Sequence, residues 1–155
     1  KFNSKKKIAI LILIIFTLNS CGFTPIYSSK GSEYKLISID KNNNNRLTNY
    51  LENNIMAISN ENATKIIKIK LVLRENISVI LKDSKGDPSK NRLTVTVDLT
   101  LNDVKDNLIS FKKFSESFEY DVQDNKFNMK QYEKTISLNL TDKISQQIQV
   151  LLNNI

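Results

Sequence analysis

Residues 66–81 read IIKIKLVLRENISVIL, and residues 93–102 read LTVTVDLTLN. In both stretches apolar side chains alternate with polar ones, which is the period of a β-strand with one buried face. The inward sets are Ile67, Ile69, Leu71, Leu73, Ile77, Val79 and Leu81 in the first stretch and Leu93, Val95, Val97, Leu99 and Leu101 in the second. A strand with one buried face and one solvent-exposed face is typical of an antiparallel sheet. The two stretches therefore predict a long hairpin, with a turn at 83–91 marked by Gly86 and Pro88.

A further strand is predicted on each side of this hairpin. Residues 34–39 form the first strand, and residues 108–121 form the last one after a tight connection at 103–107. The side chains expected on the inner face are Tyr34, Leu36 and Ser38 in the first strand and Phe114, Phe118 and Tyr120 in the last. The pattern is less regular near Phe111, which predicts a β-bulge there.

Two amphipathic helices are predicted, over residues 44–59 and 129–155, because apolar side chains recur there every three or four residues. The first stripe is Leu47, Tyr50, Leu51, Ile55 and Ile58, and the second is Met129, Tyr132, Ile136, Leu140, Ile144, Ile148, Leu151 or Leu152, and Ile155. The asparagine run 42–45 stands where a helix N-cap is expected.

These elements give the order β-α-β-β-β-α in a single α+β domain, 34–155. Each helix must bury its apolar stripe against the sheet, and the strands are expected to meander antiparallel. We therefore expect a two-layer sandwich, in which a four-stranded, mostly antiparallel sheet carries two helices on one face. The chain shows no internal repeat, and 155 residues are enough for one domain and hardly for two.

The first twenty residues have the pattern of a lipoprotein-type signal peptide. Three lysines, at positions 5–7, precede an apolar run over 8–18 that is too short to span a membrane. Leu18-Asn-Ser-Cys21 follows and resembles the bacterial lipobox, where the cysteine thiolate takes up a diacylglyceryl group and a small residue before it admits the peptidase. We expect cleavage before Cys21, lipid on Cys21 and a tether over 21–33. Gly22, in place of an inner-membrane retention aspartate, favours the outer membrane.

Composition excludes several classes of site. The chain has no histidine and one cysteine, so it cannot form a histidine-based triad, a histidine metal cluster or an internal disulfide. No phosphate-binding or nucleophile-elbow motif is present, so we expect no enzyme, no cofactor and no metal. The net charge is +7, but four of the 23 basic residues lie in 1–20, and the remaining 19 outnumber the 16 acidic ones by only three. Such a surplus does not argue for nucleic-acid binding.

A basic cluster stands at the turn between the two long strands, and its members are Lys82, Lys85, Lys90 and Arg92. Asp83 and Asp87 dilute the cluster, while further cations at positions 68, 70 and 74 extend it along the polar strand face. One interpretation is a solubilising, edge-protecting pattern. The other is a site for a phosphorylated anionic lipid, because lysine and arginine donate to phosphate oxygens.

Residues 21–27, CGFTPIY, resemble the Cys-Gly-Phe-x-Pro-Leu-Tyr start of the LptE family of lipopolysaccharide-assembly lipoproteins. Asn45-Arg-Leu47 at the first helix and the β-α-β-β-β-α order also resemble that family. The likeness covers essentially the whole chain after residue 20, and its specific part is the seven-residue start. The sequence departs from the pattern at position 26, where isoleucine replaces leucine, and its turns are unusually polar.

The resemblance implies an outer-membrane lipoprotein on the periplasmic side. Such a protein would plug the LptD β-barrel, help it to fold and contact lipopolysaccharide on its way to the cell surface, without a cofactor or turnover. The alternative is a lipid-anchored envelope-assembly accessory or pilot protein with a different partner. A periplasmic lipid carrier would need a large cavity, for which a two-layer sandwich of about 130 residues has little room.

Overall fold

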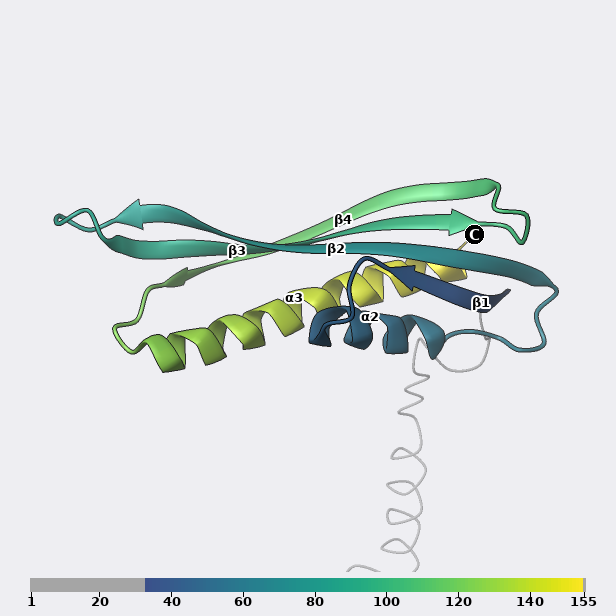
Figure 1. Ribbon diagram of the computed structural model, residues 1–155, viewed down its shortest axis with the longest axis horizontal. Coiled ribbons are helices and arrows are strands. Elements are labelled where there is room, and N and C mark those ends of the chain that lie inside the picture. Colours follow the sequence, from purple (N-terminus) through teal and green to yellow (C-terminus); the bar gives the residue numbers. More distant parts are fainter. Residues whose placement is uncertain (1–32, 155) are drawn as a thin grey trace, which may run out of the picture. The chain divides into compact units, whose positions relative to one another are not determined.

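The computed structural model describes residues 33–154, so the predicted signal peptide, Cys21 and nearly all of the tether lie outside the described residues. The elements are β1 (Tyr34–Lys41), α2 (Arg46–Met56), β2 (Lys65–Lys82), β3 (Pro88–Asn102), β4 (Leu108–Asp121) and α3 (Lys126–Asn153). The strands form one sheet in the order β1-β2-β3-β4, with both helices against one face (Figure 1). The predicted α+β class and the order β-α-β-β-β-α are confirmed.

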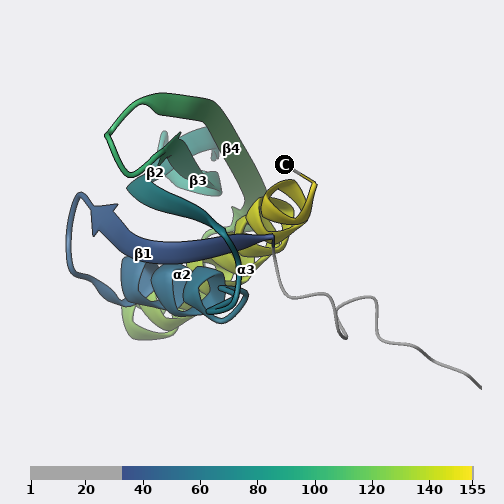
Figure 2. The same ribbon diagram turned by 90° about the vertical axis from the view of Figure 1, so that its right-hand side faces the viewer.

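Strands β2, β3 and β4 form the expected antiparallel meander, in which Leu71 pairs with Leu99 and Val97 with Phe114. Strand β1 differs, because it runs parallel to β2, with Tyr34 opposite Lys65. The cause is α2, which lies between the two strands in sequence and carries the chain back to the end at which β1 began (Figure 1). Figure 2 shows α2 beneath β1. A helical crossover of this kind joins parallel neighbours, whereas a short turn joins antiparallel ones.

The core lies between the sheet and the helix layer. All five inward side chains predicted for β3 are buried, as are the first four of β2. The helices contribute Leu47, Leu51 and Ile55 from α2 and Met129, Ile136, Leu140, Ile144, Ile148 and Leu152 from α3. The periodicity of the sequence thus placed the core correctly in the middle of the sheet.

Two irregularities move side chains away from their predicted faces. Strand β1 shifts register between Leu36 and Ser38, so that Ser38 is exposed and Ile39 packs against the core in its place. In β4, Leu108 pairs with Asn102 and Ser110 with Leu101, so Ile109 is a bulge close to the position predicted from Phe111. The β4 prediction is correct for buried Tyr120 and partly buried Phe114, but Phe118 is 45% exposed.

The second half of β2 also departs from expectation. Ile77, Val79 and Leu81 are exposed, although Ile77 and Val79 pair with residues on the inner face of β3. Strand β1 ends opposite Leu71, and α2 begins only a short way past that end before it runs back beneath β1 (Figure 1). The hairpin therefore continues past the elements that cover its first half, and the expectation of a fully buried inner face is wrong there.

The sheet accordingly has two unlike ends. We call the end with the β2–β3 turn, Asp83–Asp87, the distal end. The basal end carries the β3–β4 turn, Asp103–Asn107, together with the start of β1 and the end of α3 (Figure 1). The bare part of the β2–β3 hairpin reaches past the end of β4 at the distal end (Figure 1).

Candidate functional site

The basic cluster predicted from the sequence lies at the distal end, but its members differ in their surroundings. Arg92 forms an ion pair with Glu119 on β4 at 2.5 Å, and Lys90 lies 3.7 Å from Asp121. Within residues 33–154, no ion pair involves Lys82 or Lys85. The structure therefore separates the four into two partnered and two unpartnered cations.

The turn itself fixes where Lys85 stands. The Asp83 carboxylate accepts hydrogen bonds from the backbone N–H groups of Lys85 and Asp87, both at 2.9 Å. Gly86 has φ of +89°, a backbone conformation that a side chain disfavours. The Asp83 carboxylate therefore bonds to the backbone of the turn, and no ion pair joins it to a lysine side chain within the described residues.

A groove of 450 Å³ lies beside the bare half of the hairpin, where α2 begins. Its lining comes from three elements and comprises Arg46, Leu47, Glu75, Lys130, Glu133, Lys134 and Ser137. Three cations and two carboxylates thus share one recess over an apolar floor at Leu47. The sequence could not have indicated this site, because the residues are scattered over α2, β2 and α3 and no local motif joins them.

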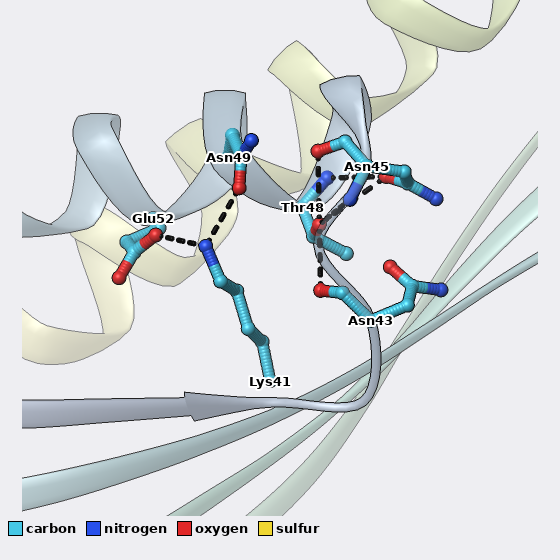
Figure 3. A network of polar contacts seen from close by, with 6 residues as sticks. All are labelled: Lys41, Asn43, Asn45, Thr48, Asn49 and Glu52. Atoms are coloured by element: carbon cyan, nitrogen blue, oxygen red, sulfur yellow. Dashed lines mark hydrogen bonds and ion pairs between the residues drawn. The ribbon is translucent and has the colours of Figure 1, made fainter.

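Polar contacts hold the start of α2 at the edge of this groove. Asn45 caps the helix: its side chain accepts a hydrogen bond from the Thr48 N–H at 2.9 Å, and the Asn45 N–H donates to the Thr48 hydroxyl at 3.0 Å (Figure 3). The Lys41 ammonium at the end of β1 donates to Asn49 at 2.6 Å and to Glu52 (Figure 3). The interpretation of the asparagine run as a helix cap is confirmed at Asn45.

Asn42, in the same run, closes the exposed edge of β2. Its side chain both donates to the Leu73 carbonyl at 3.0 Å and accepts from the Leu73 N–H at 3.1 Å. The side chain therefore replaces one residue of a neighbouring strand, directly after the point where β1 ends.

The far wall of the groove is tied to the sheet through a buried tyrosine. The Tyr120 hydroxyl donates to Glu133 at 2.7 Å, and its ring meets Tyr132 edge-on, with the ring centroids 6.0 Å apart. Burial raises the pKa of Tyr120 far above its ordinary value, and the hydrogen bond to the Glu133 carboxylate raises it further. Tyr120 is therefore a neutral donor that fixes the position of one groove carboxylate.

A second groove, of 220 Å³, runs along the other side of α3. It is lined by Phe118, Tyr132, Thr135, Ile136, Asn139, Leu140 and Lys143. This groove explains why Phe118 is not part of the core: it faces the helix layer at the edge of the sheet, and α3 leaves part of its ring uncovered.

Residues 33–154 hold no group of three or more His, Cys, Asp or Glu side chains placed to bind a metal ion. None of the helices in that part of the chain is long and apolar enough to cross a membrane.

No protein-family model matches the chain, and the search of curated proteins finds no relative. Several solved structures share its fold. Rare lipoprotein B from Shewanella oneidensis aligns with a TM-score of 0.58 at 14% identity, over 77% of this chain and 97% of its own. A minor lipoprotein from Acinetobacter baumannii gives 0.59 at 18% identity, over 77% and 90%. A putative lipoprotein from Caulobacter crescentus gives 0.52 at 16% identity, over 79% and 88%. The described domain therefore has the fold of these bacterial lipoproteins.

Proposed function

We propose that this chain is an LptE-type lipoprotein of the outer membrane. It is anchored on the periplasmic side by lipid on Cys21, plugs and helps to assemble an LptD-type β-barrel, and aids delivery of lipopolysaccharide to the cell surface. It acts by binding, without catalysis and without a cofactor. The observation that carries the proposal is the fold shared with several solved lipoproteins. The CGFTPIY start supplies the link to this particular family.

The surface of the sheet fits the interior of a barrel, which is polar in outer-membrane proteins. The face turned away from the helices carries Thr94, Thr96 and Thr100 along the middle of β3. Asp98, in the same row, is paired with Arg74 on β2, and Thr96 lies 3.4 Å from Ser115 on β4. This row of hydroxyl groups, with the Asp98 carboxylate neutralised by Arg74, can lie against a polar barrel wall without burying an unpaired carboxylate.

The distal end fits contact with an anionic lipid. Lys82 and Lys85 project from a hairpin that reaches past β4, and no carboxylate pairs with either side chain within the described residues. Phosphate oxygens can therefore approach these two ammonium groups without first breaking an ion pair. Arg92 and Lys90 would have to leave Glu119 and Asp121.

This difference makes the lipid-binding role testable. Neutralising Lys82 and Lys85 to glutamine should weaken lipopolysaccharide binding by roughly tenfold or more, because each lysine near an anionic lipid contributes about 1 kcal/mol. Lys90→Gln with Arg92→Gln is the matched control and should have a smaller effect. Equal affinity for the wild type and both double variants would exclude lipid binding at the distal end.

The barrel partner is tested separately by purifying the full chain from the bacterial envelope. An LptD-type barrel should be the dominant copurifying protein. A different envelope protein in that place would favour the alternative function, an assembly accessory or pilot protein.

A further inference from the structure

We propose that the basal β3–β4 hairpin is a membrane-contacting surface that inserts apolar side chains among the lipid head groups of an anionic leaflet. The inference rests on the proposed lipid anchoring at Cys21 and extends it. The surface is formed by Val104, Leu108, Ile109 and Phe111, which we call the basal apolar cluster. All four side chains are exposed, Leu108 by 66% and Phe111 by 55%.

The β4 bulge gathers this cluster. Leu108 pairs with Asn102 and Phe111 with Thr100, and these two β3 residues lie on the sheet face away from the helices. With Ile109 bulged out, Leu108 and Phe111 therefore become successive side chains on that same outer face. Without the extra residue, Leu108 would point toward the helix layer. Val104 stands at the turn directly beyond them, so the apolar groups cover the tip and one side of the hairpin.

Three lysines lie next to the cluster in sequence, and nearby acids are already engaged. Lys113 shares the outer face with Phe111, whereas Lys112, opposite Leu99, lies on the other face of the edge strand. Among the described residues, no ion pair involves Lys105, Lys112 or Lys113. Asp103 accepts hydrogen bonds from the Lys105 and Asn107 N–H groups, both at 2.8 Å, and Asp106 pairs with Lys68 at 2.7 Å. Surfaces that lie on an anionic bilayer combine exposed aliphatic and aromatic side chains, which insert among the lipids, with nearby cations, which attract the anionic head groups.

The position of the cluster agrees with this partner. Tyr34 pairs with Lys65, Lys68 with Asn102, and Asn102 with Leu108, so the described chain begins at the same end of the sheet. By strand geometry, Leu108 lies about 14 Å across and about 10 Å along the sheet from Tyr34. The twelve residue steps from Cys21 to Glu33 span at most about 40 Å. A lipid on Cys21 would thus hold the basal end, rather than the distal end, next to the bilayer.

The four side chains alone would bind a bilayer weakly, since even a single acyl chain anchors reversibly. Anchoring through a short tether raises the effective concentration of the surface to about millimolar, so that a weak contact becomes occupied. The consequence is orientation: the cluster would hold the basal end on the leaflet and direct the distal hairpin away from it.

The chain contains no tryptophan, so Phe111→Trp introduces a unique fluorophore at an exposed position. We would reconstitute the full chain into vesicles of phosphatidylethanolamine and phosphatidylglycerol with dibrominated acyl chains. Phe127→Trp, at the 70% exposed start of α3 near the distal end, is the matched control. The Phe111→Trp indole should shift to shorter wavelength and lose most of its emission, whereas the Phe127→Trp indole should change little. Adding Leu108→Asp should restore the emission of the Phe111→Trp chain.

The outcomes separate this proposal from the function on which it rests. Vesicles that carry the chain but leave both indoles equally unquenched would overturn the membrane contact and keep the anchor. A Phe111→Trp indole that is shielded only after a purified barrel is added would identify the surface as a protein interface and also overturn the proposal. A chain that does not float with vesicles would overturn the anchor and the membrane contact together.

Discussion

The two turns of the meander have the same backbone design but stand in different surroundings. In both, the first aspartate accepts from the N–H groups two and four residues later: Asp83 from Lys85 and Asp87, and Asp103 from Lys105 and Asn107. The fourth residue has positive φ in each, Gly86 at 89° and Asp106 at 65°. Exposed apolar side chains flank both turns, but Ile77 before the distal turn lies on the face toward the helices, whereas Leu108 and Phe111 beside the basal turn lie on the opposite face. The distal turn also carries the basic cluster. The aspartate hydrogen bonds therefore give both turns the same backbone, and the residues around each turn give the two ends different surfaces.

The strands behind the turns differ as well. Near the basal end, β1 pairs along the edge of β2 and the helices cover the inner face of the sheet, while the distal half of β2 has no neighbouring strand on that edge and no cover from α2 (Figure 1). The hairpin thus combines a folded half that supplies stability with a projecting half that offers surface. Mutations of the same kind in the two halves should separate these contributions.

The largest difference is expected between Ile69→Ala and Ile77→Ala. Both residues lie on the inner face of β2, but Ile69 is 2% exposed and Ile77 is 42% exposed. Ile69→Ala should lower the free energy of unfolding by about 2–5 kcal/mol, as other buried isoleucine truncations do. Ile77→Ala should lower it by less than about 1 kcal/mol. Chemical denaturation measures both, and equal losses would show that the distal half is covered after all.

Tyr120→Phe should have the next largest effect, because it leaves the Glu133 carboxylate without its tyrosine donor. We expect a loss of about 1.5–3 kcal/mol near neutral pH, the range for hydrogen bonds to charged groups. Since the pKa of Tyr120 is higher in the folded chain than in the unfolded one, this stabilisation is present below about pH 10 and disappears as the pH rises further. The stability gap between wild type and variant should therefore narrow above pH 10. A gap that widens there would contradict the assignment.

Exchanging the positive-φ residues of the two turns should have the smallest effect. Gly86→Asp should cost about 1 kcal/mol, because a side chain disfavours this conformation even though a Cβ would meet no atom within 4 Å. Asp106→Gly should change the free energy of unfolding by less than about 0.5 kcal/mol, because relief of strain is offset by the entropy of glycine and the loss of the Lys68 ion pair. A larger cost at Asp106 would show that the basal turn depends on its aspartate.

The sequence was sufficient for the order of the elements and for most of the core. Alternation and helical spacing are local signals, and they located β3, β4 and the buried stripe of α3. The same signals could not show that β1 pairs in parallel or that Ile77 is uncovered, because both depend on where α2 packs. They placed the start of the last helix at Met129, whereas Asn125 caps it: its side chain accepts from the Phe127 and Asn128 N–H groups.

The candidate site was predicted only in part. The sequence showed that the distal turn is basic. It could not show that Glu119 and Asp121 neutralise Arg92 and Lys90, because those carboxylates lie on a strand far along the chain. The basal apolar cluster did leave a signal, in that Leu108-Ile109-Ser-Phe111 is followed by two lysines and breaks the alternation. That irregularity predicted the bulge, and the register then showed which face the apolar side chains take.

Site-specific photocrosslinking in intact cells tests most directly whether the two ends of the sheet contact different partners. A crosslinker at Lys85, in the distal turn, should capture an LptD-type barrel or lipopolysaccharide, while one at Lys105, in the basal turn, should capture phospholipid. Capture of an unrelated envelope protein from position 85, or the same captured species from both positions, would contradict the account.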